Sequence, residues 1–531
     1  MDYLSIALSL TAVLVALYYY STRKLSFFKD HEIPHLPPTP LFGNLGSMFA
    51  MRSTLYDLLK KMYFMNTEAK YIGVYEFQTP VIMIRDLDLI KSITMKNFEH
   101  FADHRVLVQK ELDPMFSKML FSMTGEEWKE HRNMLSPAFT SSKIKNMFQL
   151  MSRCAVRFSN YISKLPESER ETDMKALLSK YTNDVIASCV YGISVDSIKE
   201  PKNVFYVYGR IGTMFTTFKK SMFLIINRNL PWIAKLFRLK MLEGYVEKFF
   251  AEIALNEIET RQRNGIHRSD MLQMFIDTNN KKESGKGMSA ESMAYHAFSF
   301  FFGGFDTVVS QTCFVAHLLA ENPDCQVRLQ QEIDEALEQN DGQLSYDIIQ
   351  NMKYLDAVIN ETMRMYPIAV FVDRLCLKDF DLPPTLPGSK PFTIKQGMNI
   401  WVPIIPIQID PKYYENPETF DPDRFLEDGK KIINSGAFMP FGIGPRMCIG
   451  NRFALIEMKV LLCHILATCS FKVGSQTTTP LQLQKGSYNL TMQNGFFLKI
   501  EPRKNPYYST EVSEVNGIAN GGVNGVAKSV N

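Results

Sequence analysis

The chain has 531 residues, of which 46% are hydrophobic, enough for a large buried core. Lysine and arginine number 59 against 56 aspartate and glutamate residues, so the overall charge does not favour a nucleic-acid partner. Eight cysteines lie far apart without a C-x-x-C pair, as is typical of small buried side chains in a reducing compartment. Length alone would allow several domains, but no linker divides the chain internally.

The first segment predicts a membrane anchor. Residues 3–20 contain no charged side chain, and Arg23 and Lys24 follow soon after. Eighteen helical residues span about 27 Å, which is enough to cross the core of a bilayer. A cleavable signal peptide is the alternative, but Asp2 replaces the basic start of such peptides and no small-residue cleavage site follows. We expect residues 1–22 to be a single transmembrane helix, with the basic residues after it favouring a cytosolic body.

The next segments differ in their patterns. Residues 23–44 are basic and rich in proline, and we expect them to form an extended hinge. From residue 45 to about 100, short β-branched runs such as residues 81–84 predict a small sheet. Helical patterns dominate from residue 100 to about 380, whereas residues 380–440 are dense in proline and predict mostly coil.

A long helix is predicted after residue 448, where apolar side chains recur at helical spacing. Residues 45–504 therefore predict one catalytic domain that is mainly α with a minor β region. The remaining residues, 505–531, are rich in asparagine and glycine and lack apolar bulk, so we expect a disordered tail.

Aromatic residues are concentrated between residues 204 and 241, where Lys219, Lys220 and Arg228 interrupt them. An aromatic surface with scattered basic side chains is typical of a lid that dips into the membrane interface. Helices that are simply buried are an equal alternative. The aromatic residues are Phe205, Tyr206, Tyr208, Phe215, Phe218, Phe223, Trp232 and Phe237.

The longest predicted helix runs from about residue 289 to residue 320. Gly303 and Gly304 at its middle each weaken a helix by about 1 kcal/mol, so some benefit should offset them. Thr307 lies four residues after Gly303, so its hydroxyl can bond that carbonyl and open a local kink. Asp306 and Thr307 place an acid and an alcohol beside the space left by the missing side chains. The alternative is a packing notch where another helix crosses closely.

Glu361 and Arg364 lie three residues apart on one face of a predicted helix. A solvated surface pair is the common explanation for this spacing. Here the flanking sequences are strongly apolar, which favours burial, and a buried ion pair needs further partners. Arg424, in the stretch F-D-P-D-R-F at residues 420–425, is a candidate partner.

Residues 441–450 read F-G-I-G-P-R-M-C-I-G, so Cys448 sits in a glycine-rich loop before a predicted helix. Backbone N–H groups and the helix dipole favour negative charge there and can hold the sulfur as a thiolate. A thiolate ligand pushes electron density toward a haem iron and favours O–O cleavage. None of the nine histidines sits in a comparable loop. His296, eleven residues before Thr307 on the long helix, either faces the pocket or is a core histidine.

These motifs, in this order over residues 30–500, resemble the cytochrome P450 family, and within it the microsomal animal type and the insect detoxification branch. The resemblance implies the cytochrome P450 fold and one heme b (iron protoporphyrin IX) whose iron is bound by Cys448. It also implies that Asp306 and Thr307 route protons for oxygen activation, as in the family pattern A/G-G-x-D/E-T. Gly303 takes the first position of that pattern, and Val308 replaces a second threonine that often follows.

The resemblance also suggests which residues hold the haem. Its two propionates need cations, and arginine suits planar carboxylates because its fork donates twice. The family's W-x-x-x-R pattern implies Trp128 and Arg132 as anchors, and Arg374 and Arg446 match the other usual anchors. A plain surface charge is the alternative for each arginine. Phe441 resembles the aromatic residue that packs beside the sulfur and limits access of water.

Two further sets of residues take their roles from the resemblance. Glu361, Arg364 and Arg424 match the family's E-x-x-R and P-x-R-F patterns, which form a structural triad beneath the haem. The implied walls of the substrate pocket are the loop before Trp128, the lid at residues 204–241, and residues 298–302, 368–371 and 487–489. These walls are largely apolar or aromatic, which favours a lipophilic substrate.

The resemblance implies a monooxygenase that consumes dioxygen and two electrons, inserts one oxygen atom into its substrate and releases water. The chain has no flavin or NADPH fingerprint, so we expect electrons from NADPH–cytochrome P450 reductase at the endoplasmic reticulum membrane, with cytochrome b5 as a second candidate donor. A basic docking face for the reductase, as opposed to solvated side chains, would comprise Lys129, Lys143, Lys145, Arg452 and Lys459. The alternatives are a thiolate-haem isomerase or dehydratase acting on peroxides, and a non-catalytic haem-binding membrane protein.

Overall fold

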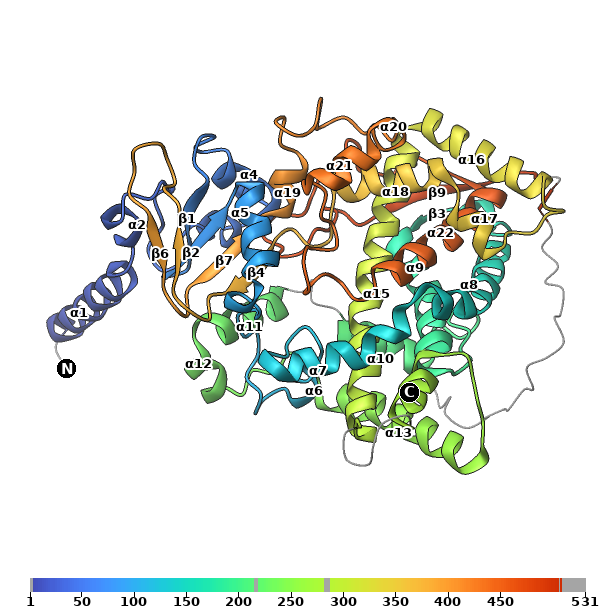
Figure 1. Ribbon diagram of the computed structural model, residues 1–531, viewed down its shortest axis with the longest axis horizontal. Helices are drawn as coiled ribbons and strands as arrows, with labels where there is room; N and C mark the ends of the chain where they lie inside the picture. Colours follow the sequence, from blue (N-terminus) through green and yellow to red (C-terminus); the bar gives the residue numbers. More distant parts are fainter. Residues whose placement is uncertain (1–2, 214–217, 281–286, 506, 509–531) are drawn as a thin grey trace.

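The computed structural model describes residues 3–213, 218–280, 287–505, 507 and 508. A part that contains the main sheet lies beside a larger, helical part, and helix α1 (Tyr3–Thr22) projects away from both (Figure 1). The prediction of a mainly α fold with a minor β region is confirmed.

The helices vary in length from one turn to nine. Those before the lid are α2 (Phe27–Asp30), α3 (Gly46–Phe49), α4 (Leu55–Tyr63), α5 (Leu87–Lys91), α6 (Pro114–Ser117), α7 (Gly125–Leu135), α8 (Ser141–Ile162) and α9 (Met174–Ile186). The lid and the helices up to the long central one are α10 (Val204–Thr213), α11 (Phe218–Asn229), α12 (Pro231–Leu236), α13 (Gly244–Asn264), α14 (Met271–Asn280) and α15 (Ala290–Glu321). The remaining helices are α16 (Pro323–Glu338), α17 (Tyr346–Gln350), α18 (Lys353–Met365), α19 (Ile404–Gln408), α20 (Asp423–Glu427), α21 (Gly429–Ser435) and α22 (Asn451–Thr468).

The four-stranded sheet combines segments that are far apart in the sequence. Its order is β1 (Tyr71–Glu76), β2 (Thr79–Ile84), β7 (Asn399–Val402) and β4 (Val372–Leu375). The hairpin of β1 and β2 was expected from the apolar run at residues 81–84. Strand β7 runs parallel to β2, with Asn399 opposite Val81, and antiparallel to β4, with Ile400 opposite Arg374.

Two small sheets complete the β structure. One has the order β3 (Glu171–Asp173), β9 (Phe497–Pro502) and β8 (Cys469–Lys472), and the other pairs β5 (Phe380–Leu382) with β6 (Phe392–Ile394). The prediction of mostly coil for residues 380–440 is confirmed for more than half of this stretch, which also contains three strands and three short helices that were not predicted. Each of these elements has seven residues or fewer, which is too short for a clear periodic pattern.

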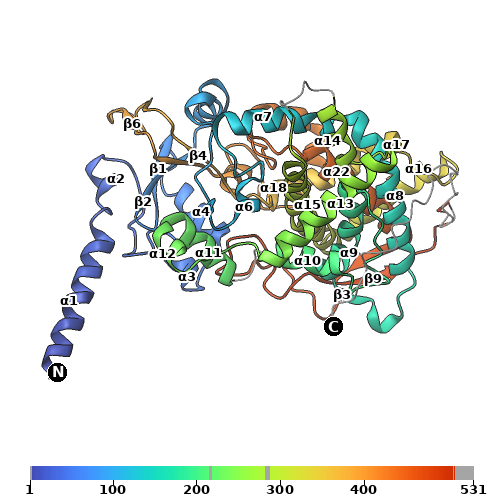
Figure 2. The same cartoon turned by 90° about the horizontal axis from the view of Figure 1, so that it is seen from below.

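Helix α1 is the described helix whose length and composition suit a membrane span, and its side chains are almost entirely exposed. The expected hinge after it is attached to the body in part. Phe28 is completely buried, its ring lies against Gly73 of β1, and its N–H donates to the Tyr75 hydroxyl over 3.0 Å. Figure 2 shows α1 extending to one side of the molecule from α2.

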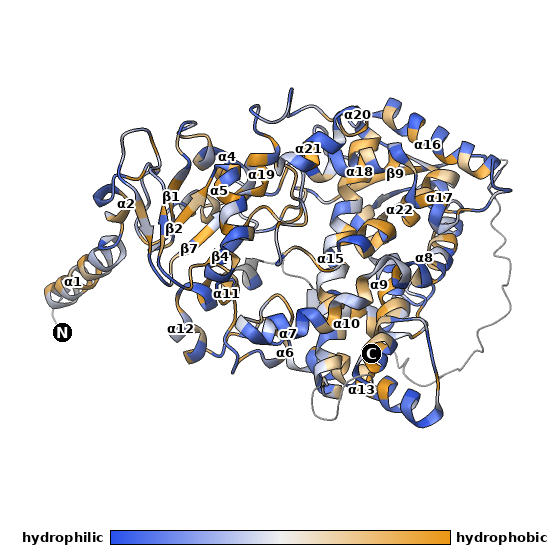
Figure 3. Ribbon diagram, viewed as in Figure 1, coloured by the Kyte–Doolittle hydropathy of each residue, from blue (hydrophilic) through white to orange (hydrophobic). Residues whose placement is uncertain are grey.

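Helix α15 crosses the centre of the helical part and packs against α9, α13, α18 and α22. It begins where Ser289 accepts a hydrogen bond from the Ser292 N–H, and it ends two residues before Pro323, close to the predicted limits. Within the body, orange apolar segments alternate with blue hydrophilic ones, whereas α1 is coloured orange and pale, without strongly hydrophilic turns (Figure 3).

The start of the expected tail contacts the body. The Asn505 amide donates to Asp334 over 2.7 Å, and the Tyr508 hydroxyl lies 2.6 Å from His464 Nδ1. Residues 506 and 509–531 lie outside the described residues, so the prediction of disorder there stays a prediction.

Candidate active site

Cys448 lies in a tight loop that leads into α22. Gly442 and Gly444 both have positive φ, at 78° and 77°, and a Cβ on Gly444 would lie 2.2 Å from the Thr94 carbonyl oxygen. Only glycine fits at such a position. The Cys448 N–H donates to the Phe441 carbonyl over 2.9 Å, which closes the loop and fixes Phe441 beside the cysteine.

The Cys448 thiol is exposed, although protein atoms surround it on most sides. Burial raises the pKa of this thiol, and the Gly450 N–H and the charge of Arg132 oppose that rise without cancelling it. The expectation that the helix start favours a thiolate at Cys448 stays a prediction. A metal cation deprotonates a thiol that it coordinates, so the thiolate would form on metal binding.

Three of the four predicted anchors contact the loop or one another. Arg446 Nη2 donates to Asp103 Oδ1 and to the Met123 carbonyl, both over 3.0 Å, and its guanidinium lies 3.8 Å from the centre of the buried Trp128 ring. Arg374 Nη2 is 3.4 Å from the Ile443 carbonyl within the loop. Arg132, on α7 with Trp128, lies close enough to interact with the Cys448 sulfur.

Two of these arginines have donors left over. Among the described residues, neither Arg374 Nε nor Arg446 Nη1 has a hydrogen-bond partner, although both atoms are buried. Burial lowers the pKa of each guanidinium to about 10, still well above neutral, so both stay charged. Buried charged donors without acceptors are costly, and a carboxylate satisfies them best. The site therefore fits the carboxylate groups of a haem.

The acid and the alcohol lie on the middle of α15. Thr307 Oγ1 donates to the Gly303 carbonyl over 2.6 Å, as predicted, while α15 continues as one helix through this point. Asp306 Oδ1 forms an ion pair with Lys175 Nζ on α9 at 2.8 Å, with both side chains about a quarter exposed. A Cβ on Gly303 would meet no atom within 4 Å, so the alternative of a close helix crossing fails at Gly303, whereas a Cβ on Gly304 would lie 3.6 Å from Ile186 at the end of α9, so a helix does pack closely there.

The link between α15 and the cysteine loop is aromatic. Phe300 of α15 meets the Phe139 ring edge-on at 4.8 Å, and Phe139 lies 3.7 Å from the position of a Cβ on Gly450. Asp306 and Thr307 thus belong to a helix that is held against the loop by packed rings.

The predicted structural triad is buried and bonded. Arg364 Nε and Nη2 donate to the two Glu361 oxygens over 2.7 and 2.8 Å, and both side chains are completely buried. Arg424 Nε is 3.5 Å from Glu361 Oε1. The alternative of a solvated surface pair is wrong, because apolar residues and the backbone around Gln408 enclose this pair.

His296 is a core histidine. It is completely buried, and its Nε2 lies 2.7 Å from His131 Nδ1 on α7. Burial, with a smaller contribution from His131, lowers the pKa of His296 to about 3, so it is neutral.

Two other expectations need correction. Phe298 and Phe301 are completely buried and pack against α10 and α13, so they belong to the core and not to a pocket wall. Phe302 of the same stretch does face the loop before Trp128, where it stacks with Phe121 at 6.0 Å. Lys459 is 1% exposed and pairs with Asp356 at 2.7 Å, so it cannot belong to a docking face.

One part of the lid is buried and another is exposed, so the buried-helix interpretation holds for the first part and the membrane-interface interpretation suits the second. Phe205 and Tyr206 are 3% exposed and pack in the core, whereas Trp232, Leu236 and Phe237 are 63 to 68% exposed on and just after α12. Phe215 and the side chain of Phe218 lie outside the described part of the structure.

The sequence did not reveal a buried cluster of charges between α11 and the main sheet, formed by Glu76, Arg105, Arg228 and Asp373. The only sign of this cluster in the sequence was a charged residue at the end of an apolar strand, as at Glu76, or within one, as at Asp373. The arginines that pair with these residues come from distant segments, so the sequence pattern could not identify them.

Comparison with known proteins gives one consistent result. The cytochrome P450 family model matches residues 34–500. Cytochrome P450 9e2 of Blattella germanica is 41% identical over 521 residues, which cover 93% of this chain and 97% of that protein. Probable cytochrome P450 9f2 of Drosophila melanogaster is 37% identical over 513 residues, covering 93% and 99%. Cytochrome P450 6j1 of Blattella germanica is 31% identical over 487 residues, covering 92% and 95%.

Proposed function

Because the chain belongs to the cytochrome P450 family of haem-dependent monooxygenases, we propose that it inserts one oxygen atom from O2 into lipophilic small molecules, xenobiotic or endogenous. The second oxygen atom leaves as water, formed with two protons and two electrons. We propose heme b as the cofactor, with Cys448 as its iron ligand.

The observation that carries this proposal is the pair of unpaired, buried guanidinium donors beside the Cys448 loop. Arg374 and Arg446 would bind the propionates, Arg132 and Trp128 would support them from α7, and Phe441 would shield the sulfur. When bound, the haem supplies an iron whose thiolate ligand favours O–O cleavage. The Gly450 N–H and the Arg132 charge both favour the anionic sulfur that this requires.

Asp306 and Thr307 are proposed to handle protons. The Thr307 hydroxyl donates its hydrogen bond to the Gly303 carbonyl, so the lone pairs of Oγ1 are free to accept a hydrogen bond from another group. Asp306 is partly exposed, so water can reach its carboxylate beside Lys175. A proton would then enter at the Asp306 carboxylate and pass to the group that is hydrogen-bonded to Thr307 Oγ1.

The surroundings support a lipophilic substrate and a membrane location. Phe121, Phe302, Phe371 and Tyr488 lie at the walls that the family resemblance implies, and Phe371 stacks on Trp401 at 4.3 Å. The exposed apolar residues of α12 suit the membrane interface, together with α1 as an anchor. We propose the endoplasmic reticulum membrane, with a domain boundary near residue 45 and the catalytic domain in the cytosol.

We propose that NADPH–cytochrome P450 reductase supplies the electrons, with cytochrome b5 as a further donor. Among the basic residues expected to dock the reductase, Lys143 and Arg452 are exposed. Lys129 and Lys145 are occupied by nearby carboxylates, at 2.9 Å from Glu126 and 2.6 Å from Asp347. The docking face would therefore centre on Lys143 and Arg452.

The test is spectroscopic and then catalytic. The reduced, haem-loaded protein with carbon monoxide should show the red-shifted Soret band that strong sulfur donation implies, and Cys448→Ser should abolish it. Oxidation of lipophilic probes should require both the reductase and O2. Turnover of peroxides without the reductase would indicate an isomerase or dehydratase, and haem binding without any turnover would indicate a non-catalytic protein.

A further inference from the structure

Four buried charged side chains fasten the lid to the main sheet. Arg228 of α11 places Nε 2.9 Å from Glu76 Oε1 and Nη2 3.0 Å from Asp373 Oδ2. Arg105 Nη1 lies 3.0 Å from Glu76 Oε2. The side chains are 1 to 18% exposed, and two guanidinium groups face two carboxylates, with the His104 ring nitrogen Nδ1 2.9 Å from Asp373 Oδ1. We call Glu76, Arg105, Arg228 and Asp373 the ionic cluster.

The ionic cluster connects the end of α11 to three strands. Glu76 ends β1 and Asp373 lies in β4, while Asn399 begins β7. With its amide oriented to satisfy its neighbours, Asn399 accepts from Arg228 Nη2 over 2.9 Å and donates to the Arg374 carbonyl over 3.0 Å. In return, Arg105 Nη2 donates to the Arg228 carbonyl over 3.0 Å and to Asn229 Oδ1 over 3.1 Å. The C-terminal end of α11 is therefore held by Arg228 from within the helix and by Arg105 from outside it.

The ionic cluster lies next to the proposed site. Asp373 directly precedes Arg374, which reaches the cysteine loop at Ile443. Tyr488 lies near Glu76 and Arg228, and its ring meets Phe371 edge-on at 6.3 Å. A movement of α11 away from the sheet would thus disturb both a proposed propionate anchor and a proposed pocket wall.

The lid bridges the two parts of the molecule. Helices α12, α11 and α10 follow one another from the sheet-containing part to the helical part (Figure 2). At the helical end, Phe205 of α10 packs edge-on against Phe301 of α15 at 5.4 Å. Where the lid ends in sequence, just before α13, Asp113 accepts hydrogen bonds from the Met241 and Leu242 N–H groups over 3.1 Å. Arg228 lies between these two fastenings along the chain, and α11 can leave the sheet only when several charge-assisted hydrogen bonds break together.

We propose that Arg228 is a specificity-determining residue that closes α11 over the route into the site, so that the ionic cluster limits the entry of bulky molecules more than that of small ones. This inference rests on the proposed function, because it assigns the gate of the same site. The ionic cluster stays closed on its own, since its two guanidinium groups face two carboxylates, and opening requires water to replace the carboxylate partners of Arg228.

The experiment measures how fast two azoles bind to the haem-loaded full chain. Imidazole is the small probe and clotrimazole the bulky one, and stopped-flow absorbance at the Soret band follows both. Arg228→Met should raise the association rate of clotrimazole about tenfold or more, with less than about a twofold change for imidazole. Arg228→Lys, which keeps a cation, should lie between wild type and Arg228→Met.

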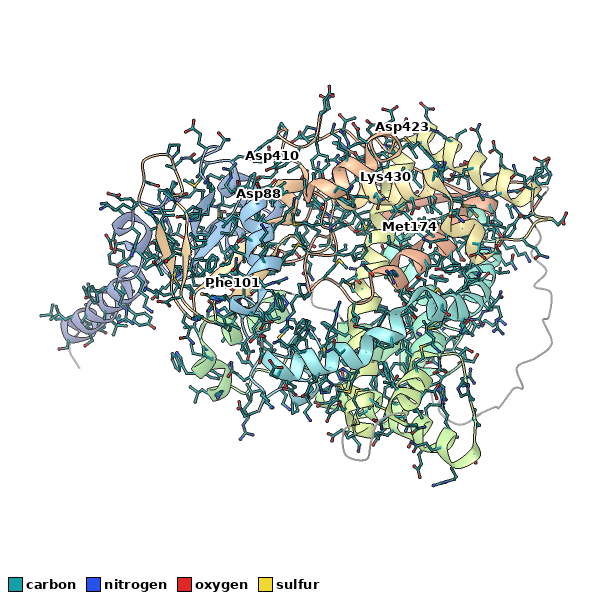
Figure 4. All side chains as sticks on the ribbon, viewed as in Figure 1. Asp88, Phe101, Met174, Asp410, Asp423 and Lys430 are labelled. Carbon is teal, nitrogen blue, oxygen red and sulfur yellow. The ribbon has the colours of Figure 1, made fainter. Side chains whose placement is uncertain are left out.

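Arg328→Met is the matched control. Arg328 also donates two hydrogen bonds to a carboxylate, that of Asp423, but this pair is about half exposed. Asp423 begins α20 at the top of the view, whereas α11 lies in its lower left part (Figures 1 and 4). The control should bind both azoles as wild type does.

The outcomes separate the gate from the function. Equal acceleration of both azoles, or none, in Arg228→Met overturns the gate. If Arg228→Met does not fold, Arg228→Lys and Asn229→Ala replace it. The first weakens the contacts of Arg228 with the carboxylates, and the second removes a contact of Arg105 with α11. Unchanged clotrimazole association rates in both variants would overturn the gate. Absence of a Soret band before any azole is added counts against the proposed function. A normal Soret band with size-independent rates counts against the gate alone.

Discussion

Arg364 and Arg374 are ten residues apart and almost completely buried, yet they are bonded in different ways. Every nitrogen of Arg364 donates, two of them to the carboxylate of Glu361 and one to the Gln408 carbonyl. Arg374 donates only to backbone carbonyls and leaves Nε unpaired among the described residues. A buried cation whose bonds are complete serves the scaffold, whereas one with a donor left over is suited to bind an anion from outside the chain.

The largest effect should come from breaking the complete pair. Glu361→Gln leaves the Arg364 charge buried without its counter-ion, which costs about 3–5 kcal/mol of unfolding free energy. Urea unfolding of the solubilised protein, followed by circular dichroism, measures this loss. Glu418→Gln removes a carboxylate from an exposed pair with Lys60 and should cost at most about 1 kcal/mol. Equal losses in the two variants would show that the buried pair is not a scaffold.

A buried carboxyl with no cation provides the next contrast. Among the described residues, no basic side chain pairs with Glu457 of α22, and burial raises its pKa to about 8, with only the Thr182 hydroxyl acting against this. Because the folded pKa lies above the unfolded value of 4.5, its contribution to stability is complete below pH 4.5 and is lost as the pH rises through 8. Wild type should lose stability relative to Glu457→Gln by about 1.4 kcal/mol per pH unit in this window.

Urea unfolding at several pH values between 5 and 8 tests this pH dependence. The Glu457→Gln curve should be the flatter one, since a glutamine does not titrate. Parallel curves for the two proteins would mean that Glu457 is ionised in the folded state.

Arg374, which has a hydrogen-bond donor left over, should behave in the opposite way to the fully bonded pair of Glu361 and Arg364. Arg374→Met removes a buried charge and fills a similar volume, so the protein should fold with native circular dichroism. Its haem should dissociate about 10–100-fold faster, because a group that orients the cofactor is gone. Transfer of haem to excess apomyoglobin measures the rate, with Arg328→Met as the control arginine. A loss of unfolding free energy as large as that expected for Glu361→Gln would assign Arg374 to the scaffold.

The sequence predicted the features that depend on local pattern. The limits of α15 follow from a capping serine and a proline, and the bond from Thr307 to the Gly303 carbonyl follows from a spacing of four residues. The glycine-rich loop around Cys448 was also predicted, because the φ angles at Gly442 and Gly444 restrict the choice of residue. These features need no knowledge of what packs against them.

The features that were missed depend on distant segments. Strand β7 pairs with β2 across more than three hundred residues, and with only four residues it carries almost no pattern of its own. The ionic cluster combines β1, the loop at Arg105, α11 and β4. Lys459 was assigned to a basic docking face, with a solvated side chain as the alternative, and both would expose it. Only its contact with Asp356 of α18 shows why it is buried.

The smallest effect is expected where a pair is neither fully buried nor exposed. Asp306 and Lys175 are about a quarter exposed, so Lys175→Met should cost less than about 1 kcal/mol of unfolding free energy. Lys60→Met is the matched control, since Lys60 lies at the same 2.8 Å from its carboxylate and is 30% exposed. In steady-state oxidation, Lys175→Met should stay within about threefold of wild type, because the Asp306 carboxylate that would take up the proton is still present, whereas Asp306→Asn removes it. If Lys175→Met slowed oxidation as much as Asp306→Asn, the ion pair itself, and not the carboxylate alone, would be the unit that handles the proton.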